Sequence, residues 1–556
     1  MPAAALCLLG LPVEILRKIV SYVDCRSQLE RYATQFSSDD ISNQTAPLLS
    51  VCEVLRSLAL ERACAKCSID INDDSDRSLV TFKSWPKSKR LPHASTLAKY
   101  TRQVSLNVDF WDILHGDACE ILENATWVQS AFPNVVKLSI LIGGACIGGD
   151  FYAFDAKRKH MTQFAQTIRA IMPRVYAVKV KLNNAMTFIE KSQATSQLLN
   201  SLVEMIYGDS KQRRMKVYYN EFEIGILPNC ITDLTHVDIS VHHYSAATMM
   251  LLHKSAHSLQ SLEVRFHDTV HLPKLVSDYS GNTVVYPNLH KLVLTEWTHS
   301  LPYRKASTNH THTPFPQLKL LSIDMEYPFS DETLFRGNSR TLESLKMALD
   351  PITVDMLRTS DTFANGNYAK LRNLSVRSLD ISSEVQNITD YIYTSFVLKM
   401  SPALHIFTDR AVLMGHSKLS FFCSCPNLAG LRMLNLPEMV FHMSSLVPLL
   451  KSQRQLESIE CKFITDDIGM SADCMLSTYN PLSARLKFIS LTGYEEVCDS
   501  AFQSIVLLAL VCPALMRCYM LHDWREKLNA FVDSALETMP VSLYRDRLSA
   551  IKYVEY

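Results

Sequence analysis

A few side chains in this sequence have spacings that could support chemistry. Cys64 and Cys67 are spaced like a pair of zinc ligands, and His253 and His257 lie four residues apart, as on one face of a helix. A protein zinc site needs three or four such ligands. No second C-x-x-C follows the cysteines at a zinc-site distance, and the histidines have no evident third ligand. We therefore interpret them as ordinary thiols and surface histidines, and we predict no metal site.

The skeleton of a phosphate-binding loop occurs once. Gly143 and Gly148 have the G-x-x-x-x-G spacing, but Gly149 and Asp150 stand where lysine and serine or threonine are required. The G-x-G-x-x-G, G-x-S-x-G and H-E-x-x-H motifs do not occur. Glycine supplies only 15 of 556 residues, and glycine is what such loops need for their strained turns. The sequence predicts no enzyme: no catalytic residue and no cofactor.

Composition also limits the partners. Lys and Arg total 56, as do Asp and Glu, and 47% of the residues are hydrophobic. Nucleic-acid-binding surfaces leave a basic excess, so we expect no nucleic acid. We also expect no membrane partner, since the longest uncharged run, 500–516, is short for a bilayer span. The 15 cysteines form no dense framework, and no basic segment precedes the apolar start. This pattern favours reduced thiols in the cytoplasm or the nucleus.

A leucine phrase recurs through the second half of the chain. One copy is Leu289-x-x-Leu292-x-Leu294, which follows Pro287. A proline often precedes the other copies as well. Copies begin at residues 234, 259, 289, 318, 342, 371, 428, 456, 486 and 515, a spacing of about 28 residues once the one double gap is divided. The L-x-L alternation predicts a short strand with one buried face. Several of the segments that would connect one strand to the next have helical spacing, at 248–252, 445–450 and 505–510. We call these segments helical returns.

No single unit of this kind can bury its leucines alone, so neighbouring units must stack into a solenoid. The pattern over roughly residues 100–556 resembles the leucine-rich-repeat family in its longer intracellular style. That resemblance implies an α/β horseshoe of parallel strands with helices on the convex side. The alternative is a large ordinary α/β protein with many similar strands.

The amino-terminal segment contains two amphipathic helical patterns, at residues 9–24 and 48–60. The phrases L-P-x-E-I-L-x-x-I and V-C-x-x-x-R-x-L-A resemble the F-box family, a small all-α module that binds a Skp-type adaptor and, through it, a cullin ubiquitin ligase. The matching positions, which the resemblance implies contact the adaptor, are Leu11, Pro12, Ile15, Leu16, Ile19, Val51, Cys52 and Leu58. The alternative is a plain helical cap on the first repeat.

These patterns predict three parts. Residues 1–69 are assigned to the F-box-like helical module, 70–100 to a charged linker, and 101–556 to the solenoid with an insertion around 181–232. The module departs from its family in two ways: the spacer 26–47 is longer than usual, and Leu55 occupies the position of an expected tryptophan.

Target recognition would use the side chains that alternate with the buried leucines, because these point to the open, concave face of the strands. Along this face the predicted residues carry both signs of charge, which suits a protein better than a phosphate backbone. The predicted target-binding residues are Glu263, Arg265, Asp324, Lys346, Arg377, Arg432, Glu460 and Tyr519, and the same rule places Leu434 on this face.

The resemblance to F-box proteins with leucine-rich repeats implies a substrate-recognition subunit of an SCF-type cullin ubiquitin ligase. The F-box would bind the Skp-type adaptor, and the repeats would hold an unknown protein target. The alternative is a leucine-rich-repeat interaction scaffold with a helical cap and no role in ubiquitin transfer.

Overall fold

The computed structural model describes part of the chain and divides it into two compact units, residues 1–268 (unit 1) and 269–556 (unit 2). The described residues are 65–72, 79–82, 98–124, 132–143, 154–182, 201–202, 205–206, 214–218, 233–241, 246–266, 275–278, 280–296, 313–324, 337–338, 340–349, 368–378, 404–409, 428–442, 446–464, 483–493, 512, 514–520, 530 and 552–555.

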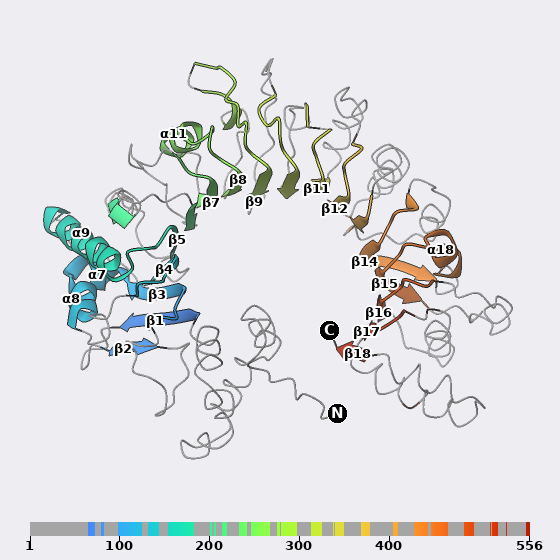
Figure 1. The fold of residues 1–556 in the computed structure, drawn as a ribbon, viewed down its shortest axis with the longest axis horizontal. Coiled ribbons are helices and arrows are strands. Elements are labelled where there is room, and N and C mark those ends of the chain that lie inside the picture. The colour runs from blue at the N-terminus through green and yellow to red at the C-terminus, as the bar shows by residue number, and fades with distance from the viewer. Residues whose placement is uncertain are drawn as a thin grey trace, which may run out of the picture. The chain divides into compact units, whose positions relative to one another are not determined.

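Unit 1 is a ladder of mostly parallel strands (Figure 1). Strand β1 pairs antiparallel with β2 and parallel with β3, and from β3 each strand pairs parallel with the next as far as β8. The strands are β1 (Lys66–Asn72), β2 (Leu79–Phe82), β3 (Gln103–Asp109), β4 (Lys137–Gly143), β5 (Ala177–Leu182), β6 (Arg214–Tyr218), β7 (His236–Val241) and β8 (Ser261–Phe266).

Unit 2 is a ladder in which every pairing between consecutive strands is parallel. Its strands are β9 (Lys291–Glu296), β10 (Leu320–Asp324), β11 (Ser344–Leu349), β12 (Asn373–Ser378), β13 (Ile406–Asp409), β14 (Met433–His442), β15 (Ser458–Ile464), β16 (Phe488–Gly493), β17 (Arg517–Met520) and β18 (Lys552–Glu555).

The leucines of the recurring phrase form the core of these ladders. Leu292, Leu321 and Leu345 occupy matched positions on neighbouring strands, and each is at most 1% exposed. The same row continues in unit 2 through Leu374, Phe407, Leu434, Ile459 and Ile489. A fully buried leucine contributes roughly 1.5–3 kcal/mol, so this row and the neighbouring buried row of Leu294, Ile323 and Met347 both stabilise the ladder.

In each unit the described helices lie on one side of the strands (Figure 1). In unit 1 they are α7 (Phe110–His115), α8 (Asp117–Asn124), α9 (Phe154–Ile171) and α11 (Ala246–Lys254), and in unit 2 α18 (Leu446–Ser452). Helix α7 ends at Gly116, whose φ of 92° is accessible to glycine at little cost. His160 Nδ1 of α9 lies 2.8 Å from the carbonyl oxygen of Leu114, so the two helices are also joined by a polar contact.

Two of the three predicted helical returns fall on described helices. Residues 248–252 lie in α11 and 446–450 lie in α18, whereas 505–510 are outside the described residues. Parallel strands joined in register, a stacked row of buried leucines and helices on one side of the strands define the architecture. The fold is a leucine-rich-repeat solenoid, as the sequence predicts.

The strand ladder begins earlier than the sequence predicts. Residues 70–100 were expected to be a linker, yet β1 and β2 lie at 66–72 and 79–82, and β1 pairs in register with β3. The buried anchors of β1 are Cys67, Ile69 and Ile71. A phrase built on leucines misses this strand, because its alternation uses cysteine and isoleucine instead.

The predicted insertion at 181–232 contains a further strand of the ladder. Strand β6 pairs parallel with β5 on one side and with β7 on the other. Its buried anchor is Met215, and no leucine precedes it at the usual distance of three residues. The basic residues Arg214 and Lys216 are therefore part of a strand of the ladder.

The register of β14 also differs from the prediction. Residues 428–436 contain two overlapping leucine phrases, beginning at Leu428 and at Leu431. The structure pairs Leu434 with Phe407 and Ile459, so the second phrase is the repeat. Leu434 is 1% exposed, whereas Met433, expected to be an anchor, is 40% exposed. Leu434 is therefore a core residue and not a residue of the open face.

Candidate functional site

The predicted adaptor-binding residues, Leu11 to Ile19 and Val51 to Leu58, lie outside the described residues. The same is true of Cys64 and of residues 144–150, which complete the loop that begins at Gly143. Within the described ranges, no group of three or more His, Cys, Asp or Glu side chains could hold a metal ion. None of the helices described is both long and apolar enough to cross a bilayer.

The open face of the strands is the face whose side chains alternate with the buried anchors. In β8, Leu262 and Val264 are fully buried, while Glu263 and Arg265 between and after them are partly exposed. Alternation of this kind follows from the two-residue period of a strand. Because the ladder is parallel and in register, equivalent residues of successive strands stand side by side, about 4.8 Å apart.

In unit 1 this alignment gathers charged side chains into one cluster, which we call the β5–β8 patch. Lys179 is paired with Lys216 in the ladder, Lys216 with Asp238, and Asp238 with Glu263. The full patch is Lys179, Lys181, Lys216, Asp238, Glu263 and Arg265.

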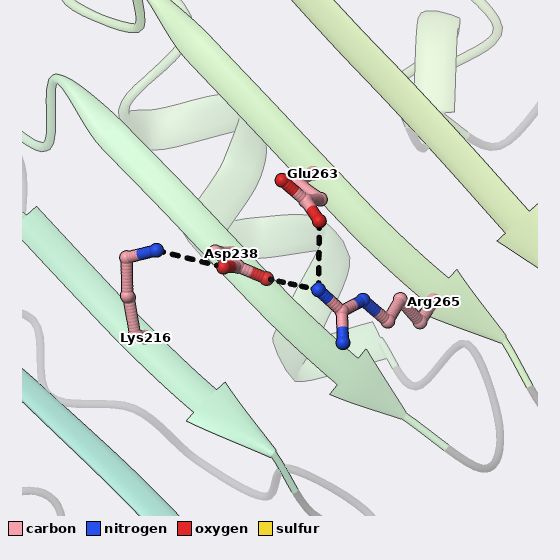
Figure 2. A network of polar contacts seen from close by, with 4 residues as sticks. All are labelled: Lys216, Asp238, Glu263 and Arg265. Atoms are coloured by element: carbon pink, nitrogen blue, oxygen red, sulfur yellow. Dashed lines mark hydrogen bonds and ion pairs between the residues drawn. The ribbon is translucent and has the colours of Figure 1, made fainter. Parts of the chain in front are cut away.

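Asp238 is the centre of the patch (Figure 2). Lys216 Nζ lies 2.9 Å from Asp238 Oδ2, and Arg265 Nη2 lies 3.9 Å from Asp238 Oδ1. The Arg265 guanidinium also donates to Glu263 Oε1 at 2.8 Å. Asp238 is 9% exposed in its side chain, against 51% for Lys216 and 32% for Arg265. A nearly buried carboxylate is thus held between two more exposed cations.

The electrostatic state of Lys179 reflects this crowding. Partial burial lowers the pKa of Lys179, and the neighbouring Lys216 lowers it further. The Asp238 carboxylate acts in the opposite direction and raises the pKa of Lys179. Both charges act on Lys179 because of the strand order. Strand β6, which carries Lys216, is next to β5, and β7, which carries Asp238, is the next strand beyond β6.

Two of the predicted target-binding residues, Glu263 and Arg265, form a direct ion pair with each other. In unit 2 the ladder neighbours of Lys346 are Ser322 and Ser375, and those of Glu460 are Asn435 and Ser490. Arg377 is an exposed open-face residue of β12, whereas Asp324 and Tyr519 belong to β10 and β17 and pair in register with Thr295 and Ser490. Lys346 and Glu460 therefore each stand between neutral ladder neighbours, unlike the charged residues of the β5–β8 patch.

Arg432 does not belong to the open face, because the β14 register moves it out of the strand. It precedes β14, and its backbone N–H donates to His405 O at 2.7 Å. Equivalent bonds join Arg372 to His405 and Arg432 to Glu457, so these residues form a row at the strand entrances of unit 2. Glu457 in this row accepts a 2.8 Å hydrogen bond from Lys487 Nζ, which lowers the pKa of Glu457.

His405 gives this row a testable pH dependence. Partial burial lowers the pKa of His405 below its usual value, and the charges of Arg432 and Arg372 lower it further. A depressed folded-state pKa adds stability that is complete above the unfolded pKa, about 6.5, and is lost as the pH falls through the folded value. The denaturation midpoint of the wild type should therefore drop more between pH 7.5 and 5 than that of a His405→Gln variant. Equal drops in urea titrations at the two pH values would contradict this account.

Comparisons with known proteins add little. No protein-family model matches the chain, and neither does any curated protein. A crystal structure of an internalin from Listeria monocytogenes is similar over 74% of this chain and 88% of that one, with 13% identity and a TM-score of 0.27. A crystal structure of the yeast Rad7 and Elc1 complex is similar over 92% and 88%, with 12% identity and a TM-score of 0.23. Because these identities and TM-scores are so low, the fold is assigned from the strand ladders of this chain and not from the likeness to either structure.

Sequence reasoning missed four residues of the patch: Lys179, Lys181, Lys216 and Asp238. Three were within reach. Val175-x-x-Val178-x-Val180 and Leu234-x-x-Val237-x-Ile239 have the spacing of the leucine phrase with other apolar residues, and the alternation within them marks Lys179, Lys181 and Asp238. Lys216 had no such signal, because β6 lacks the leucine phrase.

Proposed function

We propose that this chain is the substrate-recognition subunit of an SCF-type cullin ubiquitin ligase. The observation that carries the target-binding half is the open face of unit 1, where strands β5 to β8 hold six charged side chains of both signs in one patch. Such a surface complements another protein through charge pairing and hydrogen bonds. The chain contributes no catalytic residue and acts by holding its target near a ubiquitin-charged enzyme.

The adaptor-binding half of the proposal rests on the sequence. Residues 9–24 and 48–60 carry the two F-box-like phrases, whose apolar positions would face a Skp-type adaptor. Partners of this kind place the protein in the cytoplasm or the nucleus.

The test is co-purification of the full chain with a Skp-type adaptor and a cullin. We expect the wild type to retain the adaptor and an Ile15→Asp, Leu16→Asp double variant to lose at least tenfold of it, because two charges would be buried in an apolar contact. A Lys319→Gln variant, which changes an exposed side chain of unit 2, serves as the control and should bind normally. Absence of the adaptor from the wild-type sample would refute the proposal.

The second candidate is an interaction scaffold without a role in ubiquitin transfer. The helical pattern at 9–24 favours it equally, since a solenoid needs a cap over its first repeat. In this case the double variant would leave both target binding and target lifetime in cells unchanged. In the ligase, the same variant keeps target binding but lengthens the lifetime of the target.

A further inference from the structure

The β5–β8 patch has an excess of positive charge. Four of its members are cations and two are carboxylates, which leaves a local charge of +2 on a chain with no net charge. Both carboxylates are in contact with cations of the patch itself, Asp238 with Lys216 and Arg265, and Glu263 with Arg265. The excess is concentrated on β5 and β6, which contribute Lys179, Lys181 and Lys216.

The flanking strand β4, as far as the structure describes this region, brings no carboxylate to the patch. The equivalent open-face positions of β4 are Ser139 and Leu141, which are paired with Lys179 and Lys181. The lowered pKa of Lys179, to which Lys216, Lys181 and Arg265 all contribute after burial, shows that the cations act on one another. An added carboxylate would relieve this repulsion.

Building on the proposed function, we propose that the β5–β8 patch binds an acidic segment of the target protein, with carboxylates at alternate residues placed over Lys179, Lys181 and Lys216. The contact is made on the open face, where Lys181 is exposed and Lys179 is half-buried.

The spacing of the lysines fits an extended peptide. Lys179 and Lys181 lie on the same face of one strand, about 7 Å apart, and Lys216 is one strand away from Lys179, about 4.8 Å. In an extended acidic segment, side chains at alternate positions are also about 7 Å apart. Two carboxylates of such a segment can therefore contact Lys179 and Lys181 simultaneously, with Lys216 within reach of the first.

A nucleic acid fits the same surface less well. A phosphate backbone carries negative charge continuously and is bound by surfaces with lysine and arginine throughout. Here Glu263 and Asp238 occupy the β7 and β8 end of the patch, so a phosphate chain crossing the four strands would meet two carboxylates. A peptide can place a neutral or basic residue over that end.

The experiment is fluorescence anisotropy of a rhodamine-labelled hexapeptide in which glutamate alternates with serine, titrated with the full-length chain at 50 mM salt. We expect saturable binding that weakens as salt is raised, since exposed ion pairs are screened. A Lys179→Gln, Lys181→Gln double variant should bind about tenfold more weakly, from roughly 0.7 kcal/mol for each lost pair. Both side chains are at least partly exposed, and a thermal melt of the variant confirms that it is folded.

Two further variants sharpen the result. A matched Lys319→Gln, Lys370→Gln double variant removes two exposed lysines of unit 2 and should bind the peptide like the wild type. Glu263→Gln should bind about twofold more tightly, because it removes a carboxylate that repels the peptide. This gain cannot result from misfolding.

The inference fails if the peptide does not bind, if both double variants lose affinity equally, or if a glutamine–serine peptide binds as well. It also fails if a labelled oligothymidylate binds through these lysines and the acidic peptide does not. These results are independent of the adaptor test, which depends on Ile15 and Leu16. Adaptor binding without peptide binding would overturn this inference alone, and the reverse would overturn the ligase role alone.

Discussion

Leu434→Ala should lower the free energy of unfolding of unit 2 by about 2–5 kcal/mol, the range for leucine truncation in a packed core. The neighbouring change Met433→Ala should cost less than about 0.5 kcal/mol, because Met433 is an exposed residue. The contrast arises from the β14 register, which places Leu434 between Phe407 and Ile459 in the buried row. Truncation there leaves a cavity that parallel strands on both sides cannot close.

Urea unfolding followed by circular dichroism measures both changes, and limited proteolysis assigns the loss to unit 2. The two overlapping leucine phrases of the sequence make opposite predictions. If Leu428 began the repeat, Met433 would be the buried anchor and its truncation the costly one. A large loss for Met433→Ala with a small loss for Leu434→Ala would therefore disprove the register described above.

Asp238→Asn should destabilise unit 1 by about 1–3 kcal/mol. Removing one member of a fully buried ion pair costs roughly 3–5 kcal/mol, and the smaller value applies because Lys216 and Arg265 are partly exposed. The substitution keeps the shape of the side chain but removes its charge. Glu263 is then the one carboxylate left in the patch to balance its four cations. It should also lower the pKa of Lys179 further, since Asp238 raises that pKa in the wild type.

Asp233, three residues before the start of β7, provides a matched control. Asp233 contacts His257 at 3.2 Å, but both side chains are mostly exposed, so Asp233→Asn should leave stability unchanged. The loss in Asp238→Asn should shrink at 0.5 M salt, where repulsion among the partly exposed cations is screened. Thermal melts at low and high salt test both points, together with amine-labelling rates for Lys179 as a function of pH. Equal stabilities of the two variants would show that Asp238 does not hold the patch together.

Much of the fold was predictable from the sequence, because one local rule is repeated many times. Leu292, Leu321 and Leu345 are buried for the same reason, and their spacing alone indicates stacked strands. The prediction failed where a repeat uses other apolar residues. Ile69 and Ile71 of β1 and Met215 of β6 serve the same purpose as the leucines, and only their pairing with neighbouring strands reveals it.

The candidate site was less predictable. Alternation within a single strand correctly indicated that Glu263 and Arg265 are on the open face. It could not indicate that Lys216, 22 residues before Asp238, is in contact with that carboxylate. The contact depends on β6 being a strand in register with β7, which the sequence of residues 211–218 does not signal.

The repeating strand, its buried side and the class of solenoid all follow from the local periodicity of apolar side chains, so they can be predicted without coordinates. Tertiary structure alone decided the register of β14, the place of β6 in the ladder and the meeting of Lys216, Asp238 and Arg265. Register and charge clustering depend on which residues of neighbouring strands are paired. The stable pairing is the one that buries the most apolar surface over the whole ladder.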